Sequence, residues 1–268
     1  MADVLTFTSK KKQRSDGFMR KMLWGIIIIL VVFSLAELFF HFFIAPRILL
    51  KNVVIQSDVA LSKQEILRIA GITRKEYYFL INTAQIRNRL MAHPLVKGVN
   101  VEKIFPDTLK VTLKGRVPLL LALVNYQNKT IPAAVDEEGI IFQISDMITD
   151  WNLPVLSGLK FQNLTLGMRL PAEILPFLQE LGRISRENPD LQGLISEIKV
   201  VKNGNGDFEY ILYPLSYSKG VLVGRRINAG LIKYIFLALN LLQQEGILQK
   251  VHDLDFRTGE LVYKMKEE

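Results

Sequence analysis

Two carboxylates near the end of the chain, Asp253 and Asp255, have a spacing that suits acid–base chemistry. Residues two apart in a strand share one face, so both side chains would point the same way. Hydrolysis of a glycosidic bond uses such a pair, one carboxyl as general acid and the other as base or nucleophile. The sequence places no further general base, oxyanion donor or metal partner beside them. A hydrolase built on this pair is therefore an alternative hypothesis.

The other reactive residue types form no catalytic pattern. The histidines, His41, His93 and His252, are not spaced for a metal site, and the chain has no cysteine, which excludes thiol catalysis and thiolate metal sites. Gly204–Gly206 lacks the Lys-Ser/Thr of a phosphate loop and predicts a hairpin turn. Asp136–Glu138 is an acidic cluster that we interpret as solvated turn residues. The sequence thus predicts no enzyme site, metal, cofactor or small-molecule substrate, and favours a protein that works by binding.

The elements that position these residues begin with a membrane segment. Met22–Ala45 holds 20 apolar residues among its 24, and as a helix it would be about 36 Å long, enough to cross a bilayer. It is too long for the apolar region of a signal peptide, so we expect an uncleaved anchor. The basic tail, residues 1–21, has a net charge of +4 and predicts that the N-terminus lies in the cytoplasm and residues 46–268 outside.

Three polar residues interrupt the anchor: Ser34, Glu37 and His41. Their spacing places them on one helix face as a polar stripe. One interpretation is contact with a partner helix in the membrane. The other is that Glu37, in the outer third of the span, extends its carboxyl toward the interface.

Charge divides the exterior into two domains. Residues 46–118 carry 13 Lys or Arg and 5 Asp or Glu, a net charge of +8, whereas residues 119–268 have a net charge of −3. The basic domain lies next to the membrane, where its field could attract anionic lipid headgroups or an acidic partner. A solvated basic surface is an equally good interpretation. Nucleic acid is not expected, because this region lies outside the cytoplasm and has no aromatic residues interleaved with its basic ones.

The predicted elements of the exterior define an α+β fold. Residues 46–118 give the order β-α-α-β-β: a strand at Val53–Ile55, two helices, and two strands at Val96–Ile104 and Leu109–Leu113. The first helix begins with a capping box of Ser62 and Glu65. Residues 119–268 give a mixed β domain with two helices, and its predicted elements are strands at Leu119–Val124, Thr130–Val135, Ile140–Ile144, Ile198–Val201, Phe208–Tyr213 and Gly220–Val223, helices at Ala172–Glu187 and Asn228–Gln244, and a terminal hairpin of Val251–Phe256 and Leu261–Lys264.

Five motifs in this order resemble one known family. They are His93–Val96, Lys103–Val111, Arg116–Leu119, Ala134–Phe142 and Leu153–Gly158. The first three look like the last part of a POTRA domain, and all five together are similar to the FtsQ/DivIB family of bacterial cell-division proteins. The resemblance covers nearly the whole chain, including the single anchor.

This resemblance implies a function. It implies a non-enzymatic scaffold of the division machinery, the divisome, in the cytoplasmic membrane at the division septum, where it links other division proteins. The alternatives are the membrane-anchored envelope hydrolase and a POTRA-bearing chaperone or transport subunit. The last would bring several POTRA copies or a membrane barrel, and neither pattern is seen in the sequence.

The resemblance also implies a partner and a place for it. In the family, the FtsB–FtsL coiled-coil subcomplex binds beside the last strands, which here include Val251–Gly259. The family usually has Asp-Leu-Arg where this chain has Asp253-Leu254-Asp255. Independently, a terminal hairpin would leave its last strand as an exposed edge on which a partner segment could add as a new strand. We therefore expect the partner-binding residues to be Phe256, Thr258, Gly259, Val262 and Tyr263, with Phe256 and Tyr263 as aromatic anchors.

Overall fold

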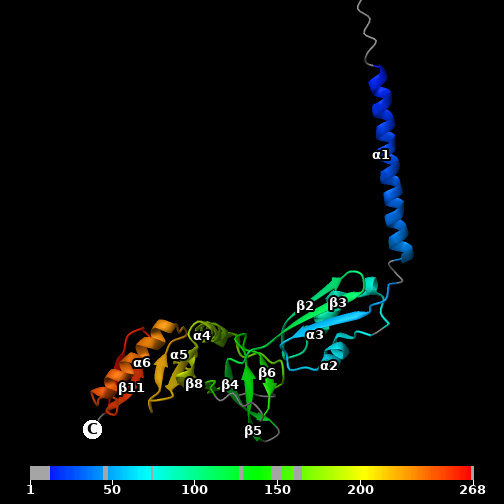
Figure 1. The fold of residues 1–268 in the computed structure, drawn as a ribbon. Helices are drawn as coiled ribbons and strands as arrows, with labels where there is room; N and C mark the ends of the chain where they lie inside the picture. Colours follow the sequence, from blue (N-terminus) through cyan, green and yellow to red (C-terminus); the bar gives the residue numbers. More distant parts are fainter. Residues whose placement is uncertain are drawn as a thin grey trace, which may run out of the picture.

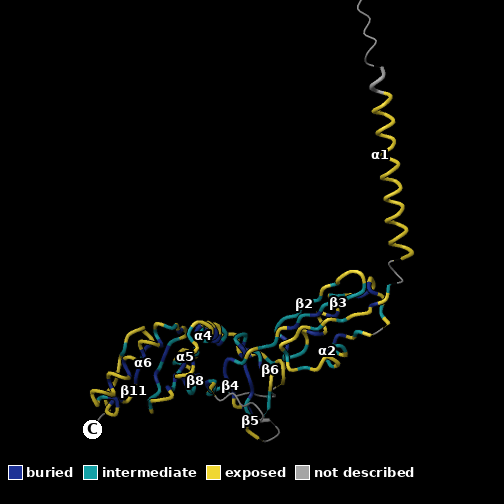
Figure 2. The backbone as a smooth tube through the Cα atoms, viewed as in Figure 1, coloured by how far each residue is buried: buried dark blue, intermediate teal, exposed yellow. Residues whose placement is uncertain are grey.

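The computed structural model describes residues 13–44, 48–73, 75–126, 129–145, 152–159 and 165–266. They form a long helix followed by two domains (Figure 1). The helix, α1 (Gln13–Phe39), continues into a π-helical turn, η1 (Phe40–Ile44). Gly17–Ile44 is long and apolar enough to cross a membrane. The helix begins nine residues before the predicted anchor, and residues 17–44 are all exposed (Figure 2).

The first domain has the predicted β-α-α-β-β order. Its elements are β1 (Asn52–Ser57), α2 (Lys63–Ala70), α3 (Thr83–Met91), β2 (Val96–Ile104) and β3 (Thr108–Gly115). A short 3₁₀ turn, η3 (Tyr78–Leu80), precedes α3. The sheet has the order β1-β3-β2, with β1 parallel and β2 antiparallel to β3. Because β3 is central, its alternate residues Leu109, Val111 and Leu113 are buried against the two helices.

Local signals explain where the helices start and stop. The backbone N–H of Glu65 donates to Ser62 Oγ at 3.2 Å, which caps the first turn of α2. Gly71 ends this helix with φ +69°, a left-handed conformation that glycine adopts without steric cost. Asn82 caps α3 in the same way as Ser62 caps α2, by accepting from Gln85 N at 3.0 Å.

The second domain is built on one sheet with the strand order β12-β11-β10-β9-β8-β7-β4-β5-β6. The first part of this domain contributes β4 (Leu120–Tyr126), β5 (Lys129–Val135), β6 (Ile141–Ile144) and β7 (Val155–Ser157). The second half supplies β8 (Ile195–Lys202), β9 (Phe208–Pro214), β10 (Val221–Val223), β11 (Val251–Asp255) and β12 (Val262–Met265).

Helices from this domain pack on the sheet in one continuous core. They are η4 (Ala172–Ile174) with α4 (Leu175–Glu187), a short α5 (Pro189–Gly193), and α6 (Ala229–Gln244). Phe177 of α4 stacks on Tyr210 of β9, with the ring centroids 3.8 Å apart. Ile235 and Leu239 of α6 belong to the same core. The sequence predicts α4 and α6 but not the single-turn α5.

Strand β7 lies in the middle of the sheet and was not predicted. It pairs in parallel with both β4 and β8. Gly158 follows it with φ +84°, and a Cβ at this position would lie 2.1 Å from the carbonyl oxygen of Val200. A side chain larger than hydrogen is therefore excluded, which accounts physically for the glycine that ends the Leu153–Gly158 motif.

The two domains meet through a buried ion pair. Arg116, just after β3, pairs with Asp136, which lies in the turn between β5 and β6 and is 1% exposed. Arg116 also donates to Glu138 Oε2 at 2.8 Å and to Pro94 O at 3.1 Å. Asp136 Oδ1 accepts from the backbone N–H of Ile140 at 2.8 Å. The acidic turn is thus an interdomain joint, and our interpretation of Asp136 as a solvated residue was wrong.

Two further contacts reinforce this joint. Glu137 pairs with Lys97 of β2 at 2.6 Å and with Arg186 of α4. The hydrogen bond from Lys97, and then the one from Arg186, lower the pKa of Glu137 below its ordinary value. Leu95, which precedes β2, packs against a small apolar cluster that includes Phe142. Charge pairing and apolar packing therefore both hold the domains together.

Candidate partner-binding edge

Strand β12 is the edge of the large sheet. It is hydrogen-bonded to β11 on one side, and among the described residues no strand pairs with its other side. Every residue of β12 is exposed, including Val262 at 58%, Tyr263 at 45% and Met265 at 45%. The predicted terminal hairpin and its edge strand are therefore present, with the second strand one residue later than expected.

The hydrogen-bond alternation identifies which backbone groups face the open side. The N–H of Lys266 donates to Lys250 O at 2.8 Å, and the N–H of Phe256 donates to Leu222 of β10 at 2.8 Å. Antiparallel strands alternate between inward and outward backbone groups. Val262 and Lys264 therefore point their N–H and C=O groups toward β11, whereas Tyr263 and Met265 point theirs away from the sheet. These outward groups offer a partner strand a template.

Phe256 does not lie on this surface, contrary to our expectation. Its side chain is 1% exposed, belongs to the main core and packs edge-on against Tyr234, with the ring centroids 5.6 Å apart. The sequence carried a signal for this, because Phe256 continues the alternation that buries Leu254. Of the two expected aromatic anchors, only Tyr263 is exposed.

Thr258 and Gly259 form the turn of the hairpin. Both are exposed, and Gly259 has φ +87° while its N–H donates to Phe256 O at 3.0 Å. Thr258 and Gly259 thus fix the turn that places Val262 opposite Asp255. Their geometry explains their residue types without a contact to a partner.

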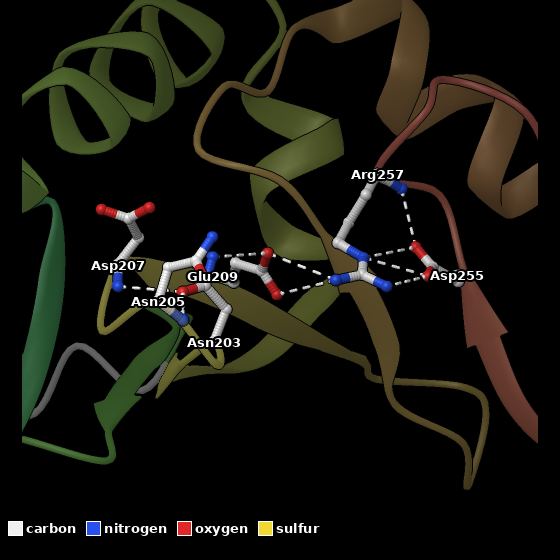
Figure 3. A network of polar contacts seen from close by, with 6 residues as sticks. All are labelled: Asn203, Asn205, Asp207, Glu209, Asp255 and Arg257. Atoms are coloured by element: carbon white, nitrogen blue, oxygen red, sulfur yellow. Dashed lines mark hydrogen bonds and ion pairs between the residues drawn. The ribbon is translucent and has the colours of Figure 1, made fainter.

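Arg257 forms ion pairs with two carboxylates beside the hairpin, those of Asp255 and Glu209 (Figure 3). Its guanidinium donates to both carboxylate oxygens of Asp255, at 2.6 Å to Oδ2 from Nη2, and reaches Glu209 of β9 at 3.2 Å. Glu209 also accepts from Asn203 Nδ2 at 3.3 Å. The hydrogen bonds from Arg257 lower the pKa of Asp255. Our sequence reasoning assigned Arg257 no role, although the Asp-x-Arg spacing was a signal for this pair.

This network bears on the hypothesis that Asp253 and Asp255 are a catalytic pair. Asp255 is held as an anion by Arg257, so it does not supply the raised pKa that a general acid requires. Asp253 lies 67% exposed at the surface, with its Oδ2 2.7 Å from His252 Nδ1. The two carboxylates share a strand face but not a cavity of the described structure, and this arrangement does not favour the hydrolase.

An apolar stripe on α6 adds to the exposed surface of this part of the domain. Tyr234, Leu237 and Leu241 are 40%, 57% and 52% exposed and follow helical spacing. Most positions of α6 are apolar. The helix is in fact buried on one side, through Ile232, Ile235 and Leu239, and exposed on the other.

The anchor carries the three polar residues that interrupt its apolar sequence. Ser34, Glu37 and His41 line one groove on the surface of α1 and η1, along with Phe33 and Phe40 among others. In the described ranges, no three His, Asp or Glu residues gather as a metal site.

Together these features define a class: a protein whose described residues comprise one helix able to span a membrane, a POTRA-like α+β domain, and a larger sheet domain with an open edge strand. The comparisons with known proteins agree. Residues 49–116 match the model of the POTRA domain, FtsQ-type. The chain is 20% identical over 226 residues to a cell division protein DivIB from Clostridium acetobutylicum, covering 83% of this chain and 85% of the relative.

A cell division protein FtsQ from Myxococcus fulvus is 23% identical over 203 residues, covering 70% of each chain. The major extracytoplasmic domain of DivIB from Geobacillus stearothermophilus matches with a TM-score of 0.31 and 17% identity, over 48% of this chain and 98% of that one. The resemblance to the FtsQ/DivIB family is confirmed: the chain is similar to these cell division proteins over most of its length, which supports a role in cell division.

Proposed function

We propose that this protein is a membrane-anchored, non-enzymatic scaffold of the bacterial division machinery. In this proposal α1 holds it in the cytoplasmic membrane at the septum, with the N-terminus inside and both domains outside. It binds and links other division proteins there. The resemblance to FtsQ and DivIB proteins supports the division role, and the open edge of β12 is the observation that carries the binding role.

The partner is an FtsB/FtsL-type coiled-coil subcomplex, which adds a segment to β12 as a further strand. Three features support this mode. The backbone groups of Tyr263 and Met265 point away from the sheet, Tyr263 offers an exposed ring, and the α6 stripe offers apolar area. At the departure from the family pattern, Asp255 is paired with Arg257, which places a cation beside this carboxylate. The hairpin turn, with Thr258 and Gly259, holds this strand in place.

The backbone test replaces one outward donor. Met265→Pro removes the N–H that would bond to the added strand, whereas Met265→Ala keeps it and removes the side chain. Proline is tolerated on the open side of an edge strand. Capture of a purified FtsB/FtsL complex by the full chain in nanodiscs should fall sharply for Met265→Pro and slightly for Met265→Ala. Equal capture by both variants would show that β12 does not accept a strand.

Topology has its own test. A reporter that is active only outside the cytoplasm should be active when fused after Glu268 and inactive at the N-terminus. The opposite pattern would contradict the proposed orientation. A fluorescent fusion should gather at midcell in dividing cells.

A further inference from the structure

Three segments of the POTRA domain converge at the end of its sheet that is nearest to α1 (Figure 1). The segment after the anchor is joined to η3, because Tyr78 N donates to Ile48 O at 2.8 Å and Leu49 bridges Tyr77. It is joined to the β2–β3 turn, because Lys51 N donates to Asp107 O at 3.0 Å. We call the exposed apolar residues of this end the POTRA tip: Leu49, Tyr77, Phe79, Leu80, Ile104 and Phe105.

The tip exposes large apolar side chains that a soluble surface seldom groups together. Leu80 is 73% exposed and Phe105 66%, and the other four are 37–45% exposed. They come from three separate segments, so no single loop accounts for them. Large exposed apolar side chains gathered at one end of a domain are typical of a contact with a membrane or a partner.

Lysines accompany the apolar groups. Lys51 has a side chain that is 74% exposed and lies 3.6 Å from Asp107. Lys103 donates from Nζ to Phe79 O at 3.1 Å and lies 5.8 Å from the centre of the Tyr78 ring. Lysines beside aromatic and aliphatic side chains are the combination found at the surface of a bilayer, where the ammonium groups remain among the lipid headgroups.

The length of chain between the anchor and the tip limits the distance between them. Ile44 ends η1, and Ile48 begins the segment that carries Leu49. Four residue steps reach at most about 14 Å. If Ile44 lies where the anchor leaves the hydrocarbon layer, then Ile48, whose carbonyl oxygen accepts from Tyr78 N, lies within or directly beside the headgroup region.

We propose that the POTRA tip inserts into the headgroup region of the bilayer that α1 spans, with Phe105 and Leu80 deepest and Lys51 among anionic headgroups. This inference rests on the proposed membrane anchoring. A lipid surface is the occupant because the tip is tied to the end of the anchor, and because aromatic, aliphatic and lysine side chains together match that interface. Membrane contact at both α1 and the tip would set the tilt of the POTRA domain.

The absence of cysteine makes the test direct, since single cysteines can be introduced and spin-labelled in the full chain. Labels at Phe105→Cys and Leu80→Cys are compared in nanodiscs with one at Val117→Cys. Val117 is 74% exposed and follows the opposite end of β3. A fourth label, at Leu30→Cys, reports on α1. Collision with oxygen, which concentrates in lipid, is measured against collision with a water-soluble nickel chelate.

The labels at residues 105 and 80 should show high oxygen and low nickel accessibility, whereas the label at residue 117 should show the reverse. If residues 105 and 80 behave like residue 117 while residue 30 is in lipid, the inference is overturned and a protein partner covers the tip. A water-exposed label at residue 30 would instead refute the anchor and, with it, the proposed function.

The role of Lys51 is tested with lipid charge. In discs of phosphatidylcholine with phosphatidylglycerol, the labels should lie deeper than in phosphatidylcholine alone. Lys51→Glu should abolish this difference, and Lys114→Glu, near the far end of β3, should preserve it. Equal depth in both lipid mixtures for the unaltered lysines would overturn the electrostatic part of the proposal.

Discussion

Arg116, at the end of the POTRA domain, forms an ion pair with Asp136, which is buried in the turn between β5 and β6 of the second domain. The pair is separated by 20 residues and lies at the joint between the domains. Because Asp136 is 1% exposed, it depends on Arg116 and on backbone N–H groups for all its partners in the described structure.

Replacing Arg116 should therefore loosen the joint. Arg116→Ala leaves a buried carboxylate without its cation, which typically costs about 3–5 kcal/mol. Urea unfolding of the exterior domains should show this loss, and limited proteolysis should cut the chain after Gly115 faster than in the parent protein. The matched control is Arg183→Ala, which breaks an exposed pair with Glu180 and should cost less than about 1 kcal/mol. Equal effects of both changes would contradict the assignment of the joint.

Acid should weaken the same joint through Glu137. The hydrogen bonds from Lys97 and Arg186 lower its pKa in the folded protein below the value of about 4.3 in the unfolded chain. Its contribution to stability is therefore complete above that value and is lost as the pH falls through the folded pKa. Urea unfolding from neutral pH down to about pH 3 should show a steeper loss of stability for the parent than for Glu137→Gln. Parallel curves would contradict this prediction.

Phe256 and Tyr263 should separate stability from binding. Phe256→Ala removes a fully buried ring and should destabilise the domain by about 3–5 kcal/mol. Tyr263→Ala changes an exposed residue and should leave thermal unfolding within about 0.5 kcal/mol of the parent, while lowering capture of an FtsB/FtsL complex. Capture that survives Tyr263→Ala, together with unchanged stability in Phe256→Ala, would reverse the roles assigned to the two rings.

The core of the POTRA domain should not tolerate a charge on β3. Val111 is completely buried, so Val111→Asp places an unpaired carboxylate in the apolar core and should unfold this domain. Thr112→Asp, on the other face of the same strand, should leave it folded. Circular dichroism and the dispersion of amide NMR signals would distinguish the two. A folded Val111→Asp variant would show that the strand register is wrong.

The sequence predicted most strands and helices because alternation and helical spacing are local properties. Val96–Ile104 has the predicted bounds, and Ser62 caps α2 as expected. Strand β7 was missed because its three residues lie between Pro154 and Gly158, a run too short to show alternation. It is stabilised by pairing with two strands that are distant in the sequence.

The site was less predictable, because partners across the fold are not visible in a single sequence. The hairpin of β11 and β12 was predictable, because its strands and turn are consecutive in the sequence. The burial of Asp136 was not predictable, since its cation belongs to another domain. Asp255 lies two residues from Arg257, so that pair was visible in the sequence, whereas the ion pair of Arg257 with Glu209 of β9 was not. From the sequence, Asp136 was interpreted as a solvated residue and Asp255 as a catalytic candidate. In the folded protein each of them forms an ion pair with an arginine.

The uninterrupted order of the large sheet has a mechanical consequence. Strand β6 lies at one edge, beside the POTRA joint, and β12 lies at the other, so eight strand-to-strand spacings separate them. At 4.7–4.9 Å each, they amount to a rigid spacer of about 38 Å. A segment that adds to β12 lengthens this spacer by one step without bending it. The sheet would then hold the partner at a fixed distance from the joint between the two domains.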